Sequence, residues 1–308
     1  MLYDVTIIGG GPAGCAASVY AARKLLKTAL ITESFGGQSL TSGDIQNWIG
    51  TISLSGDALA KALESHVRAY AGTAVDIMTG ERVENVTRTD KGFLVTMKGG
   101  KTVESKTVLV ATGGSRRELA VPGAKEFDQK GLTYCASCDG PLFSGQDVLV
   151  VGGGNAGFET AAQLLAYCTS VTLLEHNKNF VADPVTVQKV LAHPNMKGIT
   201  NAEVETVFGD KFVKGVTYRD LMTDTVHTLN ATGIFVEIGL VTATSFVKDI
   251  VNVDRINRII VHPKSQQTSV PGIWAAGDCT DALYHQNNIA AGDAVKAIED
   301  IYVWLNAK

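Results

Sequence analysis

The sequence has few of the features that mark membrane-spanning, secreted or nucleic-acid-binding proteins. No apolar run in it approaches the roughly 20 residues needed to cross a bilayer, and no Lys/Arg-rich stretch stands out. The first nine residues have neither a basic leader nor a small-residue cleavage site, so they do not resemble a signal peptide. With a net charge of −4, nucleic acid and anionic membranes are poor candidate partners. We expect a cytoplasmic protein.

Size and composition instead favour a globular chain of more than one domain. The 308 residues are about twice the commonest domain size. Hydrophobic residues make up 45% of the chain and charged residues 19%, which suits a protein with a sizeable core. Many of the 32 glycines occur in clusters, which usually means that backbone turns tightly or passes close to a ligand.

The strongest organisational signal is a near-repeat. The sequence VTIIGGGPAG at residues 5–14 resembles VLVVGGGNAG at residues 148–157, and each copy is a β-branched run that ends in GGGxxG. Each copy is followed by an Ala-rich helical stretch and then by a second apolar strand. These elements are expected at residues 13–24 and 28–32 in the first copy, and at residues 156–168 and 171–174 in the second.

Strand, glycine turn, helix and strand in this order are typical of a dinucleotide site. The first glycine makes the tight turn, the second lets backbone approach the pyrophosphate, and the third lets helix and strand pack closely. The helix N-terminus offers unpaired N–H groups to the phosphates. An acidic residue about 20 positions on accepts hydrogen bonds from the ribose: Glu33 lies 19 residues after Gly14, and Glu175 lies 18 after Gly157. Two such sites most simply bind FAD and a nicotinamide cofactor.

The rest of the pattern fits one α/β domain nested in another. Strand-like segments are expected at residues 74–111, 203–240 and 270–278. A long amphipathic helix is expected at residues 287–305. We therefore predict an α/β fold with two Rossmann-like dinucleotide-binding domains. The FAD domain would be discontinuous, over residues 1–114 and 242–308, and the nicotinamide domain would be inserted as residues 115–241.

The chemically richest stretch is YCASCDGPLF at residues 134–143. Of five cysteines, an odd number for a disulfide framework, only Cys135 and Cys138 sit at short spacing. Such a pair can close a small disulfide ring, and beside βαβ units it indicates redox chemistry. A structural zinc site would need four Cys/His ligands, and no second pair is present. Asp139 either donates a proton to a departing thiolate or caps the next helix, and the residues alone leave both open.

Together these motifs make the chain resemble the low-molecular-weight thioredoxin reductases and the flavoprotein subunit of alkyl hydroperoxide reductase. The resemblance covers essentially the whole chain and rests on GGGPAG (residues 9–14), GGQ (36–38), NW (47–48), ATG (111–113), CASCDG (135–140), GGGNAG (152–157) and AGD (276–278). Segments such as ESFGGQ at residues 33–38 look more like the peroxide-reductase subunit. That subunit carries an N-terminal thioredoxin-like module, whereas this chain begins at the FAD strand, so a separate small dithiol protein is the expected partner.

The resemblance implies roles for individual residues. The FAD pyrophosphate would be held by Gly9, Gly11, Pro12, Ala13 and Gly14, and the adenosine ribose by Glu33. The rest of the FAD site would be formed by Gly37, Gln38, Asn47, Thr112, Gly113, Gly277, Asp278, Gln286 and Asn287. The nicotinamide cofactor would be bound by Gly152, Gly154, Asn155, Gly157 and Glu175. Cys138 would lie against the flavin and exchange electrons with it, Cys135 would attack the partner's disulfide, and Asp139 would be the general acid. The resemblance also implies a homodimer.

Two departures from the family pattern bear on function. NADPH-dependent members carry an arginine cluster after the second strand of the nicotinamide domain, but this chain has EHNKNFV at residues 175–181. A lost charge-assisted contact to phosphate costs roughly 1.5–3 kcal/mol, and Glu175 would repel a 2′-phosphate, so we expect NADH rather than NADPH. In YHQNN (residues 284–288), His285 replaces Arg or Lys, and Asn287 and Asn288 are unusual. We expect His285 to be a surface histidine with its hydrogen bonds satisfied.

Three functions remain open at this point. The first is an FAD-dependent disulfide reductase that passes electrons from NADH through Cys135 and Cys138 to a thioredoxin- or glutaredoxin-like protein. The second is a thioredoxin reductase driven by ferredoxin or flavodoxin, because some reductases without the arginine cluster use neither nucleotide efficiently. The third is a flavin-bearing redox sensor or interaction protein, against which the complete set of Cys135, Cys138 and Asp139 argues.

Overall fold

The computed structural model describes residues 1–307, which fall into two compact units. Unit 1 comprises Met1–Ser115 and Val241–Lys308, and unit 2 comprises Arg116–Leu240. Unit 2 is therefore inserted into the chain of unit 1. Within the described residues, no helix combines the length and the apolar character needed to cross a bilayer.

Unit 1 is built on a seven-stranded sheet. Its strands are β1 (Leu2–Gly10), β2 (Thr28–Phe35), β3 (Val75–Thr79), β4 (Val83–Thr89), β5 (Gly92–Met97), β6 (Thr102–Val110) and β17 (Ile273–Ala275). They pair in the order β3-β2-β1-β6-β5-β4, with β17 on β6. Strands β1, β2, β3, β6 and β17 are parallel, and the β4–β5 hairpin joins β6 antiparallel. The first half of β6 pairs with β5 and its second half with β17, so one strand serves both parts of the sheet.

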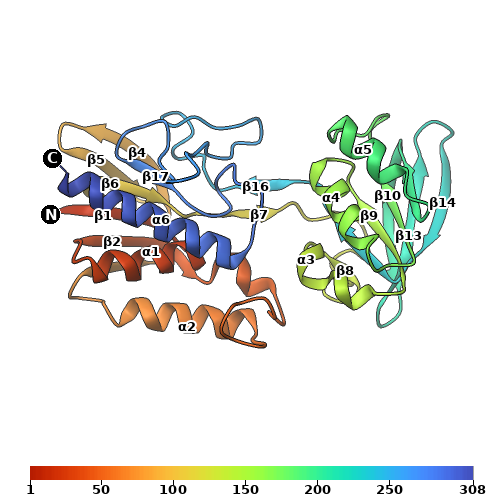
Figure 1. Cartoon of the computed structure of the whole chain (residues 1–308), viewed down its shortest axis with the longest axis horizontal. Helices are drawn as coiled ribbons and strands as arrows, with labels where there is room; N and C mark the ends of the chain where they lie inside the picture. Colours follow the sequence, from red (N-terminus) through yellow and green to blue (C-terminus); the bar gives the residue numbers. More distant parts are fainter. Residues whose placement is uncertain (308) are drawn as a thin grey trace. The chain divides into compact units, whose positions relative to one another are not determined.

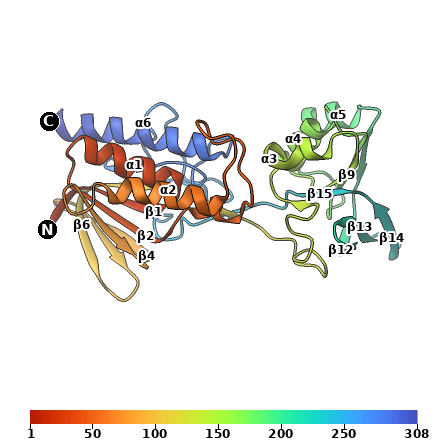
Figure 2. The ribbon, with the colours of Figure 1, turned by 90° about the horizontal axis from the view of Figure 1, so that it is seen from below.

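The helices of unit 1 lie against one face of this sheet (Figure 2). They are α1 (Pro12–Arg23), α2 (Gly56–Arg68) and α6 (Asn287–Asn306), with a short 3-10 helix, η1 (Gly37–Thr41). Helices α1 and α6 run side by side in both views (Figures 1 and 2). Their contact is made by fully buried alanines, including Ala17 and Ala21 of α1 and Ala294 and Ala297 of α6. Small side chains let the two helices approach closely, and this places the N-terminus of α6 near that of α1.

Unit 2 contains a five-stranded sheet and a three-stranded sheet. The parallel five-stranded sheet has the order β11-β10-β9-β15-β8, and the antiparallel sheet has the order β12-β13-β14. The strands are β8 (Leu132–Thr133), β9 (Asp147–Val151), β10 (Ser170–Leu174), β11 (Met196–Ile199), β12 (Ala202–Gly209), β13 (Val213–Asp220), β14 (Thr225–Asn230) and β15 (Gly233–Val236). Its helices are α3 (Ala136–Asp139), η2 (Gly140–Phe143), α4 (Asn155–Leu164) and α5 (Pro184–Leu191). The segments that join the two units, β7 (Gly114–Arg116) and β16 (Leu240–Thr242), pair with each other.

The sequence repeat appears as two equivalent βαβ elements, β1-α1-β2 and β9-α4-β10. The predicted α/β class is thereby confirmed. Two boundaries of the repeat were wrong by more than one residue. The strand expected at residues 28–32 extends to Phe35, and the second helix was expected to reach Cys168 but ends at Leu164. The chain turns there because the carbonyl of Tyr167 accepts a hydrogen bond from the N–H of Gly145 (2.9 Å), which docks this segment on the loop before β9.

Candidate functional site

The two glycine turns have nearly the same backbone geometry. Gly9 has a φ of +119° and Gly152 a φ of +116°, a region that L-residues rarely adopt. A Cβ atom placed on Gly14 would lie 1.8 Å from the carbonyl oxygen of Gly9, and one on Gly157 would lie 1.8 Å from that of Gly152. Each helix therefore approaches its strand at a distance that only glycine permits, as the sequence pattern predicts.

Open space lies in front of each helix N-terminus. The N-cap residues Gly11 and Gly154 are extended, and neither provides a side-chain cap. A Cβ on Gly154 would meet no atom within 4 Å, and the nearest to one on Gly11 would be the Cα of Gly37 at 4.0 Å. Uncapped N–H groups facing open space suit a pyrophosphate. The residues present therefore fit a dinucleotide in both units.

Several predicted FAD residues gather around the first turn in unit 1. Gly37, the first residue of η1, lies beside Gly11. A Cβ on Gly277 would lie 3.4 Å from that of Ala13 and 3.1 Å from that of Ala290 in α6. The turn after β17 thus meets the N-terminal ends of α1 and α6 at the carboxyl edge of the parallel strands. Dinucleotides bind at this edge in such sheets.

Amide side chains at the start of α6 hold the loop after η1. The Asn288 Nδ2 donates to the carbonyl of Asn47 (2.7 Å), and the Asn47 Nδ2 donates to Gln286 Oε1 (3.0 Å). The Ser39 hydroxyl donates to Asn287 Oδ1 (3.2 Å). These bonds join residues about 240 positions apart. The two asparagines that were unusual for the family pattern therefore close this loop on the helix, and the sequence contained no signal that Asn288 would take part.

The environment of His285 differs from the expectation of a satisfied surface histidine. The ring is only partly exposed, and its Nδ1 is buried without a hydrogen-bond partner among the described residues. Asp278 lies nearby, with its Oδ1 3.4 Å from this nitrogen. The next residue, Gln286, is held by the hydrogen bond from Asn47 described above.

Other predicted FAD residues take different positions. The Thr112 hydroxyl donates to the carbonyl of Ala243 (2.8 Å), so it ties two distant segments of unit 1 together. Gly113 adopts a φ of +65°. Glu33 and Gln38 have exposed side chains. Glu33 lies within β2, two residues before its end, rather than after the strand.

In unit 2, Cys135 and Cys138 form a disulfide with a Cα–Cα distance of 5.3 Å. Cys135 is the N-cap of the single-turn helix α3, and Cys138 lies within it. Cys135 is half-buried and Cys138 is exposed, whereas the remaining cysteines, Cys15, Cys168 and Cys279, are buried. Burial raises the pKa of the Cys15 thiol to about 12 and of the Cys279 thiol to about 11, which leaves both unreactive.

Asp139 occupies the N-cap position of η2, but its side chain makes no capping hydrogen bond there. Its Oδ2 instead accepts a short hydrogen bond from the Thr133 hydroxyl. Burial raises the pKa of the Asp139 carboxyl above its ordinary value, and the charge of Asp128 adds to this, whereas the hydrogen bond from Thr133 opposes it. A carboxyl that holds its proton to a higher pH beside a disulfide has the properties of a proton donor.

Helix α4 holds in place residues 135–140, which carry the disulfide and are called the redox turn below. The Gln163 Nε2 donates to the carbonyl of Ala136 (3.2 Å), and its Oε1 accepts from the Ser137 hydroxyl (3.3 Å). The Tyr167 hydroxyl packs on Gly140, where a Cβ would lie 2.2 Å from it. The helix that begins at the second glycine turn therefore also supports the segment between the two cysteines.

Glu175 is buried at the end of β10, and its carboxylate is held from two sides. One oxygen accepts from the N–H of Gly153 (2.6 Å), and the other accepts from the N–H (2.7 Å) and Nδ2 (2.6 Å) of Asn177. Asn155, also predicted to contact the nucleotide, accepts from the N–H of Asp183 (2.8 Å) and so anchors the following loop. The structure thus fixes a carboxylate against the glycine turn, where the ribose is recognised in such folds.

Glu237 borders the same turn and was missed by the sequence reasoning. It follows β15, and its carboxylate pairs with Arg116 (2.8 Å) and accepts from the Thr160 hydroxyl (2.9 Å). Burial raises the pKa of Glu237, although Arg116 and Thr160 partly offset this. An acidic residue inside the apolar run GIFVEIG was the available signal.

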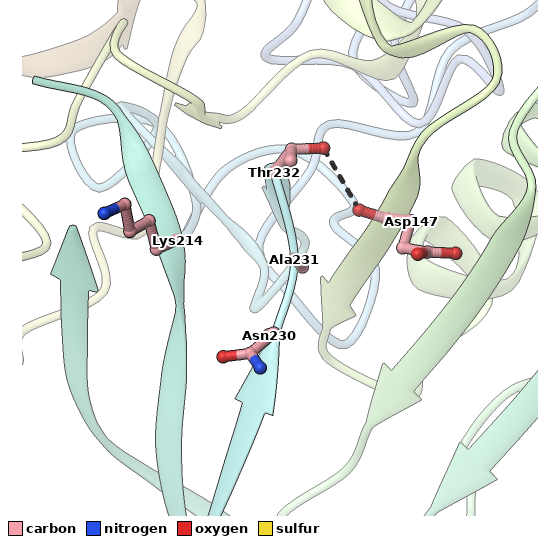
Figure 3. Close-up of a pocket in the computed structure, with 5 residues that line it drawn as sticks. All are labelled: Asp147, Lys214, Asn230, Ala231 and Thr232. Carbon is pink, nitrogen blue, oxygen red and sulfur yellow. Dashed lines mark hydrogen bonds between the residues drawn. The ribbon is translucent and has the colours of Figure 1, made fainter. Parts of the chain in front are cut away.

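One shallow pocket of about 390 Å³ lies elsewhere in unit 2 (Figure 3). Its lining residues are Asp147, Lys214, Asn230, Ala231 and Thr232. Asp147 begins β9, whereas the glycine turn follows the other end of this strand. Ligands of parallel α/β sheets bind at the carboxyl ends of the strands, so this pocket is not the dinucleotide site. Among the described residues, no group of three or more His, Cys, Asp or Glu side chains is placed to hold a metal ion.

Comparison with known proteins agrees with this geometry. The family model described as pyridine nucleotide-disulphide oxidoreductase matches residues 3–298. The chain belongs to this family. Membership in the pyridine nucleotide-disulphide oxidoreductases implies a flavin and a pyridine nucleotide as cofactors, and the predicted fold class of two Rossmann-like dinucleotide-binding domains is confirmed.

Individual members of the pyridine nucleotide-disulphide oxidoreductase family are similar over most of the chain. One subunit of the Pseudomonas putida alkyl hydroperoxide reductase is 44% identical over 298 residues, and a protein named NADH dehydrogenase from Bacillus subtilis (strain 168) is 41% identical over 295. Each alignment covers 96% of this chain but only 56% and 57% of the respective relative. The solved thioredoxin reductase from Giardia duodenalis is 32% identical, with a TM-score of 0.93 and 99% of both chains covered. The predicted resemblance to these two branches is confirmed.

Proposed function

We propose that this chain is an FAD-dependent disulfide reductase that takes electrons from NADH and delivers them, through Cys135 and Cys138, to a thioredoxin- or glutaredoxin-like dithiol partner. The observation that carries the proposal is the Cys135–Cys138 disulfide beside a protonatable Asp139, in a unit that also contains a dinucleotide turn. When bound, FAD supplies the two-electron chemistry that connects a pyridine nucleotide to a disulfide.

The chain's own residues account for the disulfide exchange. In the reduced pair, the Cys135 thiolate attacks one sulfur of the partner disulfide, so a Cys135–partner bond forms as the partner's S–S bond breaks. Asp139 gives its proton to the departing partner thiolate. Cys138 then attacks the Cys135 sulfur, releases the second partner thiolate and restores the Cys135–Cys138 disulfide. The partner gains two electrons, the proton of Asp139 and the proton of the Cys138 thiol, and Asp139 then regains a proton from solvent.

Preference for NADH over NADPH is proposed from the environment of Glu175. Its buried carboxylate is anchored by Gly153 and Asn177 and so cannot swing away to admit a 2′-phosphate. The following loop contains Lys178 but no arginine. Two of the three arginines in this unit, Arg116 and Arg219, are ion-paired within it.

The proposal is tested by mixing the FAD-loaded protein anaerobically with NADH or NADPH and following flavin absorbance by stopped flow. Fast bleaching with NADH and slow bleaching with NADPH is the expected result. If neither nucleotide bleaches a flavin that dithionite still reduces, the donor is instead of the ferredoxin or flavodoxin type. In that case the second glycine turn would have a structural role and would not bind a nucleotide.

A matched pair of glycine substitutions tests whether the second turn binds the nucleotide. Gly157→Ala places a methyl group against the carbonyl of Gly152, so it should destabilise unit 2 by about 2–4 kcal/mol. Gly154→Ala has open space and an ordinary φ of −84°, so unfolding by denaturant should change by less than about 0.5 kcal/mol. The same methyl group would occupy the space for the pyrophosphate, so calorimetry should show at least about tenfold weaker NADH binding. Unchanged NADH binding by Gly154→Ala would place the pyrophosphate elsewhere.

A further inference from the structure

Thr133 is a buried hydroxyl residue beside the redox turn, two positions before Cys135. It ends the short strand β8, which pairs with β15 in the register Thr133–Phe235, and it is 3% exposed. Its backbone position is therefore set by the parallel sheet of unit 2. No sequence motif distinguished it from the other buried threonines of the chain, such as Thr6 or Thr28.

The Thr133 hydroxyl makes two hydrogen bonds whose directions are fixed by chemistry. The backbone N–H of Cys135 can only donate, so Thr133 Oγ1 accepts from it (3.2 Å). The single hydroxyl hydrogen is then free to be donated, and it goes to Asp139 Oδ2. A chain of hydrogen bonds thus runs from the N–H of Cys135 through the Thr133 hydroxyl to the carboxyl of Asp139. Each bond in such a chain polarises the next.

We propose that Thr133 is a positioning residue for the proton donor, with its hydroxyl tying the carboxyl of Asp139 to the backbone of Cys135. The inference rests on the proposed function, in which Cys135 attacks and Asp139 protonates. Proton transfer requires the donor within hydrogen-bond reach of the leaving sulfur when the attack on the partner occurs. A carboxyl anchored to the N–H of the attacking cysteine keeps that distance, because nucleophile and acid then share one support.

The attack of Cys135 on the partner disulfide relies on Asp139 to protonate the leaving sulfur. The Cys135–partner S–S bond forms, the partner S–S bond breaks, and the proton of Asp139 moves to the leaving thiolate. A leaving thiolate of low basicity departs without a proton, whereas a basic alkyl thiolate gains from one. Loss of the anchor should therefore slow only the second kind of reaction.

Other groups near Asp139 do not supply the same support. Asp128 is the charged residue that acts on it, and its effect is repulsive. The Tyr134 hydroxyl is engaged by Leu119, from whose backbone N–H it accepts a hydrogen bond (3.3 Å). Gln163 of α4 and Tyr167, which follows this helix, contact the redox turn at Ala136, Ser137 and Gly140, but neither is hydrogen-bonded to Asp139.

The test compares two disulfide probes on FAD-loaded protein whose Cys135/Cys138 pair has been reduced and desalted anaerobically. The first probe, 5,5′-dithiobis(2-nitrobenzoate), releases an aromatic thiolate that needs no proton. The second, hydroxyethyl disulfide, releases a basic alkyl thiolate. Single-turnover oxidation of the pair is followed over a range of pH by quenching with an alkylating reagent and measuring the mass of the protein. The three other cysteines are buried and contribute little to either signal.

Thr133→Val keeps the β-branched shape of the strand residue and removes the hydroxyl. We expect about ten- to hundredfold slower oxidation by hydroxyethyl disulfide, because the lost hydrogen bond is one to a carboxyl that becomes charged as it gives up its proton. The rate with the aromatic probe should be unchanged. The fall in rate with rising pH should also move to higher pH, because the lost bond is the one that lowers the pKa of Asp139. Thr133→Ser retains the hydroxyl and should restore both the rate and the pH profile. Thr133→Ala provides a second hydroxyl-free variant if the valine protein does not fold.

The controls separate failure of this inference from failure of the proposed function. Thr206→Val removes a hydroxyl that is bonded to Thr217 on the antiparallel sheet of the same unit, and it should change neither probe. Asp139→Asn should slow only the alkyl probe, and if it slows neither, the assigned proton donor is wrong. If Asp139→Asn acts as expected but Thr133→Val leaves the pH profile unchanged, the positioning role of Thr133 is overturned while the proposed function stands. Equal slowing of both probes by Thr133→Val would mean a structural role only.

Discussion

Cys138→Ser should lower turnover of a partner disulfide by about 10³-fold or more while leaving the reduction of the flavin by NADH intact. The reason is that the two halves of the reaction use different groups. Binding of the nucleotide depends on the turn at residues 152–157, whereas transfer of electrons out of the protein requires a second sulfur to resolve the bond between Cys135 and the partner. Serine has nearly the same size but is a far weaker nucleophile at neutral pH.

Stopped-flow reduction by NADH and steady-state turnover with an oxidised thioredoxin measure the two halves separately. Cys168→Ser is the matched control in the same unit, because Cys168 is buried and donates only a weak hydrogen bond to the carbonyl of Phe143 (3.3 Å), which serine can replace. It should retain both activities. If Cys138→Ser kept turnover of the partner, the assignment of Cys138 would be refuted, and an electron route that avoids the pair would be required.

A change of the loop after β10 should shift nucleotide preference from NADH toward NADPH by about 10²- to 10³-fold in the ratio of kcat/KM. The variant combines Glu175→Ala, His176→Arg and Asn177→Arg. Two charge-assisted bonds to the 2′-phosphate contribute about 1.5–3 kcal/mol each, less the cost of ordering long side chains. Removing the carboxylate also ends its repulsion of the phosphate.

The loss of the Glu175 carboxylate and the gain of two arginines must be measured in separate variants. Glu175 holds the N–H of Gly153 and the side chain of Asn177, so its removal alone also loosens the glycine turn. The double variant His176→Arg, Asn177→Arg keeps the carboxylate and should produce a smaller shift. Reductive half-reactions with both nucleotides, together with thermal unfolding of each variant, distinguish altered specificity from a weakened fold. An unchanged ratio in the triple variant would contradict the proposed position of the ribose.

The βαβ repeat, the two glycine turns and the redox pair were predictable because their constraints are local. The geometry of Gly9 and Gly14, or of Gly152 and Gly157, depends on backbone only a few residues away, so spacing alone reveals it. The pair Cys135/Cys138 is equally local, since three residues of sequence separation can close one disulfide. The sequence could not reveal where the second helix ends, because Tyr167 turns to meet Gly145, a contact made in the folded unit.

By itself, therefore, the sequence determined the α/β class, the two dinucleotide turns and which two cysteines are paired. Tertiary structure alone decided which polar side chains support them. Thr133 is hydrogen-bonded to Asp139, Gln163 to the redox turn, and Asn288 to the backbone of a loop 241 residues away. A glycine motif depends on the backbone conformations that glycine allows, and a cysteine pair depends on a bond across a few residues. The residue types and their spacing therefore reveal both. The partner of a hydroxyl or an amide depends on which strand or helix packs beside it, and that is decided only when the sheets and helices assemble.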